Sequence, residues 1–246
     1  MTFGSLFAGI GGMDLGLERA GMKCAWQVEI DPYCQRVLAK HWPDVPKHLD
    51  VREVGGHNLE TVDLICGGFP CQDISVGGHR EGINGERSGL WVEFARIIRE
   101  LRPRFVIVEN VGDLLVRGAG RVFGDLAALG MDAEWQSIPA CALGLPQRRE
   151  RLFIVAHTVG VGRQAHSGVL GADPRRCELE KVGQLGWLSR IERGRGGGVW
   201  PVPISGLHGV ADGAARRLDA ARLKPLGNAV VPQVAEFIGR RIMEAA

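Results

Sequence analysis

The sequence predicts an α/β fold in which helices cover both faces of a parallel or mostly parallel β-sheet. Short apolar, β-like runs alternate with helical stretches over residues 1–157, and such alternation is typical of βαβ units. The length of 246 residues suits one such domain with an appendage, and an apolar content of 45% can support a sizeable core. Residues 158–206 contain many glycines and few β-like runs, which predicts a small irregular region.

Each element of this fold is predicted from a run of residues. Apolar runs predict strands at 3–7, 24–29, 62–66, 104–109, 133–138 and 151–156. Helical patterns lie between them at 12–20, 32–41, 88–101 and 120–129. A last helix is expected after Pro232, running to about residue 244.

Composition narrows the class of protein. The net charge is +2, so the chain is not a polybasic tail protein. It has no apolar run of about eighteen residues, and its first residues lack the pattern of a signal peptide. The six cysteines are scattered, with no Cys-x-x-Cys pair and no histidine cluster at zinc spacing. We therefore expect reduced thiols, no metal site and no membrane span.

The run Gly67-Gly68-Phe69-Pro70-Cys71-Gln72 is the strongest catalytic signal. It follows the predicted strand 62–66, and the ends of strands in open α/β sheets are where ligands bind. A lone cysteine is more often a small buried hydrophobe than a nucleophile. The Pro-Cys-Gln setting and the downstream Glu109-Asn110-Val111 favour the nucleophile. The glycine-rich segment 75–88, which carries Ser75, Arg80 and Arg87, is predicted to be a lid that can hinge and reach phosphates.

A glycine-rich turn, Phe7-Ala8-Gly9-Ile10-Gly11-Gly12, joins the first strand to the first helix. Such a turn lets a ligand approach the backbone, and Glu29 at the end of the second strand can accept hydrogen bonds from ribose hydroxyls. The turn alone is a weak signal that also fits a plain strand–helix connection. The third glycine of the nucleotide-redox fingerprint would fall at Asp14, which argues against a nicotinamide cofactor.

Taken together, these residues resemble the DNA cytosine-5 methyltransferase family over residues 3–156 and 224–242. Residues 7–12 resemble its S-adenosylmethionine loop, Glu29 its ribose acid and Asp50-Val51 its adenine pair. Residues 68–72 resemble its nucleophile motif, and residues 109–111 the motif whose glutamate holds the target base. Residues 147–151, Gln-Arg-Arg-Glu-Arg, and 227–230, Gly-Asn-Ala-Val, resemble two further motifs. Each motif is short, but six in the right order are highly specific.

The resemblance implies a Rossmann-like S-adenosylmethionine-dependent methyltransferase and assigns its site residues. The implied catalytic residues are Cys71, Glu109, Arg149 and Arg151. The implied cofactor residues are Phe7, Ala8, Gly9, Ile10, Gly11, Gly12, Glu29, Ile30, Asp50, Val51, Pro70, Leu90, Asn228 and Ala229. The implied DNA-binding residues are Gln72, Ser75, Arg80, Arg87, Arg175 and Arg176.

Elementary chemistry supports this assignment. A thiolate such as that of Cys71 can add to C6 of cytosine and make C5 nucleophilic. Glu109 can meet the charge that develops at N3 and the exocyclic amine if it carries a proton, and partial burial at a strand end would raise the pKa of its carboxyl. Arg149 and Arg151 would share one face of a strand and address the base carbonyl. Ordinary ion pairing is the alternative for these acids and arginines.

Two positions depart from the family pattern, and three other functions stay open. Ser5 stands where the family usually has Asp, and Ile30 where it often has an aromatic residue. The nearest alternative is an RNA (tRNA) cytosine-5 methyltransferase of the same architecture. A catalytically silent DNA-binding protein and a nicotinamide-dependent oxidoreductase are more distant alternatives.

The resemblance also implies an organisation and a setting. Residues 1–157 are expected to form the catalytic and cofactor-binding domain, 158–206 a small target-recognition region, and 207–246 a segment returning to the catalytic domain. Between His157 and Trp200 seven Arg/Lys against four Asp/Glu give a net charge of +3, which suits phosphate contacts. The implied partner is double-stranded DNA, bound by a monomer in the cytoplasm of a prokaryote or a phage-infected host. A cognate restriction endonuclease is implied if the gene belongs to a restriction system.

Overall fold

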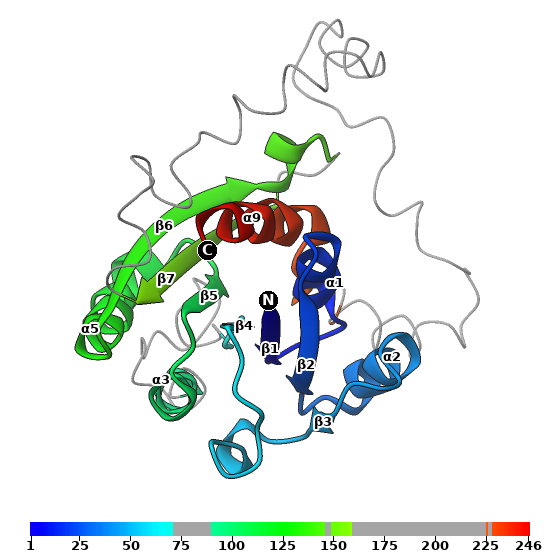
Figure 1. Ribbon diagram of the computed structural model, residues 1–246. Coiled ribbons are helices and arrows are strands. Elements are labelled where there is room, and N and C mark those ends of the chain that lie inside the picture. Colours follow the sequence, from blue (N-terminus) through cyan, green and yellow to red (C-terminus); the bar gives the residue numbers. More distant parts are fainter. Residues whose placement is uncertain (71–89, 146–148, 159–224, 226–227) are drawn as a thin grey trace, which may run out of the picture.

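The computed structural model describes residues 1–70, 90–145, 149–158, 225 and 228–246. The sheet and its helices follow one another along the chain as the sequence predicts, with a few short additions (Figure 1). In chain order the elements are β1 (Thr2–Leu6), α1 (Gly12–Arg19), β2 (Lys23–Val28), α2 (Pro32–His41), β3 (Lys47–His48), the 3-10 helix η1 (Val51–Glu53), β4 (Leu64–Gly67), α3 (Leu90–Leu101), β5 (Phe105–Asn110), α4 (Leu114–Arg117), α5 (Ala119–Ala128), β6 (Met131–Pro139), the 3-10 helix η3 (Ala140–Leu143), β7 (Glu150–Thr158) and α9 (Pro232–Ala245).

The seven strands form one sheet in the order β3-β2-β1-β4-β5-β7-β6. The pairs β2–β3, β1–β2, β1–β4 and β4–β5 are parallel. The last two strands run the other way, because β7 pairs antiparallel with both β5 and β6. The mixed, mostly parallel α/β fold is therefore confirmed. The strand order reverses between β1 and β4, and open α/β sheets bind ligands at such a switch point.

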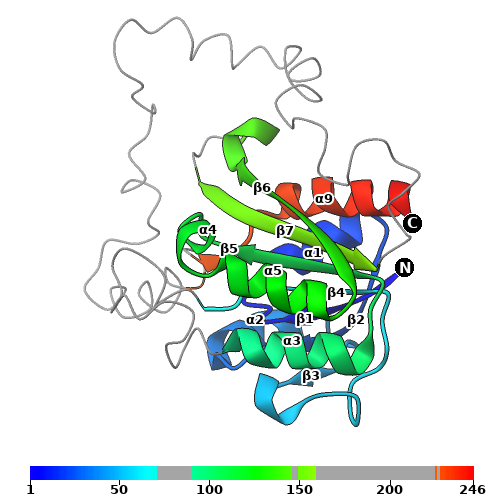
Figure 2. The same ribbon diagram turned by 90° about the vertical axis from the view of Figure 1, so that its left-hand side faces the viewer.

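Two layers of helix cover the sheet (Figures 1 and 2). On one face α1 and α9 pack against β1, β4, β5 and β7, with Leu17, Phe105 and Ile238 in that core. On the other face α3 and α5 cover the sheet, with Trp91 and Phe94 fully buried. The amphipathic pattern of each helix thus seals one face of a largely apolar sheet.

The C-terminal helix returns to the start of the chain. A Cβ at Gly12 would lie 2.2 Å from the carbonyl oxygen of Val230, and one at Gly16 would lie 2.3 Å from that of Pro232. The glycines on α1 therefore allow the backbone of residues 230–232 to approach it closely. This contact brings Asn228 and Ala229 to the edge of the sheet where β1 ends.

Two kinds of feature are absent from the residues that the structure describes. Within those residues, no helix is both long and apolar enough to cross a membrane. The same part of the chain contains no group of three or more side chains arranged to hold a metal ion.

Candidate active site

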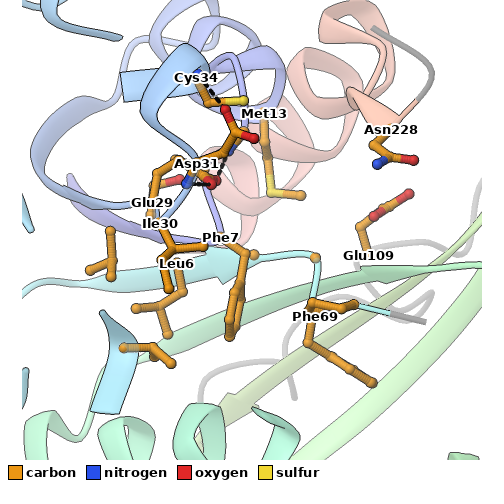
Figure 3. Close-up of a pocket in the computed structure, with 18 of the residues that line it drawn as sticks. Leu6, Phe7, Met13, Glu29, Ile30, Asp31, Cys34, Phe69, Glu109 and Asn228 are labelled. Carbon is orange, nitrogen blue, oxygen red and sulfur yellow. Dashed lines mark hydrogen bonds between the residues drawn. The ribbon is translucent and has the colours of Figure 1, made fainter. Parts of the chain in front are cut away.

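A cavity of about 720 Å³ opens at the carboxyl ends of β1, β2, β4 and β5. This volume is in the usual range for small-molecule sites, roughly 300–1,000 Å³. Glu29, Asp31 and Cys34 lie at one end of it, and Glu109 and Asn228 at the other (Figure 3). The residues that follow four strand ends thus meet in one cavity, together with a segment close to the C-terminus.

The first end of the cavity is organised around Glu29. One oxygen of its carboxyl accepts a hydrogen bond from the Gly9 amide at 2.6 Å, and the other accepts from the Asp31 amide at 2.8 Å. Asp31 in turn caps α2 by accepting from the amides of Tyr33 and Cys34. Burial raises the pKa of Glu29, and these amide donors oppose the rise. The carboxyl is therefore fixed in place beside the glycine-rich turn.

Phe7 begins that turn in an unusual conformation. Its φ is +54°, in the left-handed region that residues other than glycine seldom adopt. Such backbone strain persists where surrounding contacts enforce it, and it is common at ligand sites. The Phe7 ring packs against the core beneath the cavity, so the strained residue links the turn to the fold.

The outer rim of the same end combines apolar and charged groups. Ile30 and Leu49 are 63% and 59% exposed although both line the cavity. Beside them Asp50 accepts hydrogen bonds from the backbone and guanidinium of Arg52. These bonds lower the pKa of Asp50 and hold its carboxylate at the rim. The rim can therefore offer an aliphatic surface and an anionic acceptor to a flat, polar-edged ring.

At the second end, the carboxyl of Glu109 is nearly enclosed. Burial raises its pKa to about 7, while the positive charges of Arg151 and Arg149 act in the opposite direction. Arg151 Nε lies 3.1 Å from Glu109 Oε1. A Cβ at Gly68 would lie 2.5 Å from Glu109 Oε2, so only glycine leaves room for this carboxyl. A carboxyl with such a pKa can hold or release a proton near neutral pH.

Phe69 and Pro70 connect the two ends of the cavity and lead directly to Cys71. Asn110 is buried and donates from Nδ2 to the Phe69 carbonyl at 3.1 Å, while its Oδ1 accepts from the Val111 amide at 2.9 Å. The chain entering Cys71 is therefore bonded to the same strand end that carries Glu109.

The structure brings most of the predicted site residues together. Those that line the main cavity are Phe7, Ala8, Gly9, Glu29, Ile30, Asp50, Val51, Pro70, Leu90, Glu109, Arg151, Asn228 and Ala229. A neighbouring cavity of about 540 Å³ is lined instead by Ile10, Gly11, Gly12 and Arg149. The predicted residues that lie outside the described residues are Cys71, Gln72, Ser75, Arg80, Arg87, Arg175 and Arg176.

Sequence reasoning did not assign several residues of the cavity wall. Asp31, Leu49, Arg52 and Asn110 all line it. Asp31 carries a readable signal, because an acid followed by proline at a helix start predicts an N-cap. The bond from Asn110 to Phe69 joins residues that are distant in sequence, so no local pattern announces it.

A second polar cluster lies under the glycine-rich turn. Asp14 is completely buried on α1 and accepts hydrogen bonds from Ser5 Oγ at 3.0 Å and Gln27 Nε2 at 2.8 Å. Burial raises its pKa to about 6, and these donors lower it. Ser5, where the family resemblance leads one to expect Asp, therefore pairs with an acid supplied by the adjacent helix.

Comparison with known proteins gives relatives of one kind. The chain is 35% identical over 190 residues to the Type II methyltransferase M.DsaV of Dactylococcopsis salina, covering 75% of this chain and 53% of that protein. It is 38% identical over 160 residues to M2.BsuMI of Bacillus subtilis, covering 62% and 41%. The chain thus spans about half the length of the relatives it matches.

A solved structure and a family model agree with these relatives. A crystal structure named for a DNA modification methyltransferase of an Escherichia coli prophage matches with a TM-score of 0.55 and 26% identity, covering 64% of this chain and 47% of that one. The family model described as C-5 cytosine-specific DNA methylase matches residues 1–170. On this match over most of its length, the chain belongs to the C-5 cytosine-specific DNA methylase family.

Proposed function

We propose that the protein transfers a methyl group from S-adenosylmethionine to C5 of a cytosine in DNA, through a covalent adduct with Cys71. The observation that carries this proposal is the position of Glu109. Its carboxyl, with a pKa of about 7, shares one cavity with the fixed carboxyl of Glu29. The chain segment that leads to Cys71 runs between them. This reaction needs a site for the cofactor, a site for the base and a nucleophile between the two.

The first end of the cavity fits S-adenosylmethionine. We assign Glu29 to the ribose hydroxyls and Asp50 to the edge of the adenine, with Ile30 and Phe7 beside that ring. Gly9 and Ala8 would lie along the rest of the cofactor, with Asn228 and Ala229 near its reactive end. When bound, the cofactor supplies a methyl group on a positively charged sulfur. The remaining chemistry falls to side chains of this chain.

The reaction balances with one thiolate and one proton acceptor. The Cys71 thiolate forms a bond to C6 of the cytosine, and the displaced ring electrons make C5 nucleophilic. C5 would then form a bond to the methyl carbon as the bond between that methyl carbon and the cofactor's sulfur breaks, which leaves S-adenosylhomocysteine. Loss of the C5 proton and of the thiolate restores the ring double bond. Solvent water is the proposed acceptor of this proton.

The second end of the cavity suits the activated base. In its protonated form Glu109 donates to N3 as charge develops there, and its carbonyl oxygen accepts from the exocyclic amine. We assign Arg151, whose Nε lies 3.1 Å from that carboxyl, to the base carbonyl, with Arg149 as its neighbour. Because the target carbon lies inside the stacked duplex, the base must be flipped out, which costs a few kcal/mol.

We further propose double-stranded DNA as the partner, bound by a monomer. Residues 1–157 would form the catalytic domain, 158–206 the target-recognition region with Arg175 and Arg176, and 207–246 the returning segment. Gln72, Ser75, Arg80 and Arg87 would contact the DNA around the flipped base. The Type II names of the relatives favour a cognate restriction endonuclease and, with it, the cytoplasm of a prokaryotic cell.

A covalent trap tests this function. Duplex DNA carrying 5-fluorocytosine should form a stable adduct with the protein, because fluorine at C5 cannot leave as a proton does. Peptide mass spectrometry should place the adduct on Cys71. Cys71→Ala should form no adduct and transfer no methyl group, while calorimetry finds S-adenosylhomocysteine binding unchanged.

The duplex used in the trap is chosen by experiment. Bisulfite sequencing of DNA from cells that express the chain identifies the methylated cytosines, and the duplex is built around them. An RNA of the same sequence is the matched control. Methylation of the RNA alone, or an adduct on another cysteine, would contradict the proposal.

A further inference from the structure

Four aromatic rings form a row beneath the cavity, from its cofactor end to the segment that leads to Cys71. The rings of Phe7 and Phe94 stack with centroids 6.4 Å apart and planes 12° apart. Phe94 and Trp91 stack at 5.6 Å and 17°. Trp91 meets Phe69 at 5.6 Å with the planes tilted by 50°. Offset and tilted contacts of this kind are the favourable ones for aromatic pairs.

The two ends of the row belong to the cavity, and its middle belongs to the core. Phe7 and Phe69 line the cavity, and both rings point to the same side of it (Figure 3). Trp91 and Phe94 lie on α3 and are completely buried. Trp91 is anchored further by donating from Nε1 to Asp125 Oδ2 of α5 at 2.8 Å. The helix layer therefore supports both loops through ring contacts.

We propose that Trp91 is a positioning residue for the nucleophile, acting through Phe69, and that Phe94 gives the corresponding support to the cofactor turn through Phe7. This inference rests on the proposed function, because it assumes that Cys71 attacks the base. Phe69 is only two residues before Cys71 in the sequence, so we expect a shift of the Phe69 ring to be felt at the thiolate. Phe94 touches the other loop, and its loss should be felt by the cofactor.

The row also explains why Phe7 keeps a strained backbone. Its backbone, with a φ of +54°, carries a ring that stacks on Phe94. A side chain whose rotamer and backbone are both fixed by packing presents a rigid edge to a ligand. Phe69 is held in the same way, with its ring against Trp91 and its carbonyl bonded to Asn110.

Paired substitutions separate the two supports. Trp91→Leu should lower kcat, and the rate of adduct formation with 5-fluorocytosine DNA, by about 100-fold, since misplacing a reacting group by 1 Å can cost that much. The KM for S-adenosylmethionine should stay unchanged. Phe94→Leu should instead act on the cofactor. It should raise the KM for S-adenosylmethionine by about tenfold, which is the scale of one lost aromatic contact. Trp91→Phe keeps a ring in the row and should restore most of kcat.

Trp26→Leu is the control for lost stability. Trp26 is as buried as Trp91 and also donates its indole N–H, in this case to the Glu60 carbonyl. It lies on β2, which β1 separates from β4. The variants Trp26→Leu and Trp91→Leu should lose a similar amount of Tm, but Trp26→Leu should keep its kcat when assayed well below that Tm.

The outcomes distinguish this inference from the function on which it rests. If the wild-type protein forms the adduct and Trp91→Leu forms it equally fast, Trp91 is only a core residue and the proposed function stands. Equal losses of kcat in Trp26→Leu and Trp91→Leu, or no rescue by Trp91→Phe, would also overturn the positioning role. If the wild-type protein forms no adduct, the proposed function fails and the positioning role with it.

Discussion

Two buried polar clusters of this fold have similar composition and different surroundings. Ser5, Asp14 and Gln27 form the first, under the glycine-rich turn, and Glu109 and Asn110 form the second, at the end of β5. Each contains one carboxyl whose pKa is raised mainly by burial, to about 6 for Asp14 and about 7 for Glu109. A shifted carboxyl alone therefore does not identify the reactive site.

The two clusters differ in whether the carboxyl reaches the cavity and in whether its hydrogen-bond partners are neutral or charged. Asp14 is completely buried, and neutral donors from β1 and β2 hold its carboxyl against the sheet. Glu109 faces the cavity and pairs with Arg151. The first cluster fastens α1 to the sheet, and the second presents an acid to a ligand. The following substitutions test whether this division holds.

The largest expected effect comes from replacing the Glu109 carboxyl with an amide, and the same replacement at Asp14 is its control. Glu109→Gln should lower kcat by about 10²–10⁴-fold, the usual contribution of a positioned acid or base, with DNA affinity little changed. Asp14→Asn makes the same chemical change in the first cluster, at a completely buried carboxyl, and should leave kcat near wild type. Single-turnover methylation and DNA titration on both variants measure this. A loss for Glu109→Gln that appears only as weaker DNA binding would make Glu109 a structural acid.

The pH profile of the wild-type enzyme sharpens the same point. The protonated form of Glu109 is the proposed donor, and the pKa of about 7 means that this form declines above neutral pH. The profile of kcat/KM should therefore have a falling limb above pH 7, and Glu109→Gln should lack that limb. A wild-type profile that only rises with pH would assign the active form to the carboxylate.

Much of the fold could be predicted because its strands are apolar and its helices amphipathic. The runs at 62–66 and 104–109 correspond to β4 (Leu64–Gly67) and β5 (Phe105–Asn110), displaced by one or two residues. The two-residue strand β3 and the four-residue helix α4 were missed, because such short elements carry no periodicity. The position of β7 between β5 and β6 depends on tertiary pairing, which no local pattern records.

The candidate site was predictable where its residues form motifs and not where they meet through space. Glu29 follows a strand and a glycine-rich turn, so its place could be inferred from spacing. The pairing of Ser5 with Asp14 could not, because it depends on how α1 lies on the sheet. The expected burial of Glu109, with a raised pKa, is confirmed, because a polar residue at the end of a fully apolar strand shares the environment of that strand.

An effect of intermediate size is expected on protein stability, through Asp14 of the first cluster. Burial raises the pKa of Asp14 from its ordinary value of 3.8 to about 6 in the folded protein. Because the folded protein holds the Asp14 proton more tightly than the unfolded chain does, its contribution to the free energy of unfolding is fully present below pH 3.8. That contribution is lost as the pH rises through 6. Between pH 4 and pH 7 the wild type should lose about 2 kcal/mol relative to Asp14→Asn. Urea unfolding of both proteins across this range measures the difference, and parallel stability curves would contradict the assignment.

The smallest expected effect concerns Asn110, the member of the second cluster that bonds to the Phe69 carbonyl. Asn110→Asp keeps an acceptor for the Val111 amide but loses the donor to Phe69 when the new carboxyl is ionised. An unsatisfied buried group costs about 1–3 kcal/mol, so we expect kcat to fall by about tenfold at pH 8. S-adenosylhomocysteine affinity should change little, because Glu29 and Asp50, which are assigned to its ribose and adenine, lie at the other end of the cavity.

The pH dependence of this variant separates positioning from a general loss of stability. A protonated carboxyl can donate to the Phe69 carbonyl as the amide does, and burial favours the protonated form. The ratio of variant to wild-type kcat should therefore rise as the pH falls from 8 to 6, while a purely structural defect would leave it flat. Single-turnover rates at each pH, with both proteins assayed well below their Tm, measure this ratio. A flat ratio would leave Trp91 as the remaining support of the segment that enters Cys71, and the second cluster would then reduce to Glu109 and its arginines.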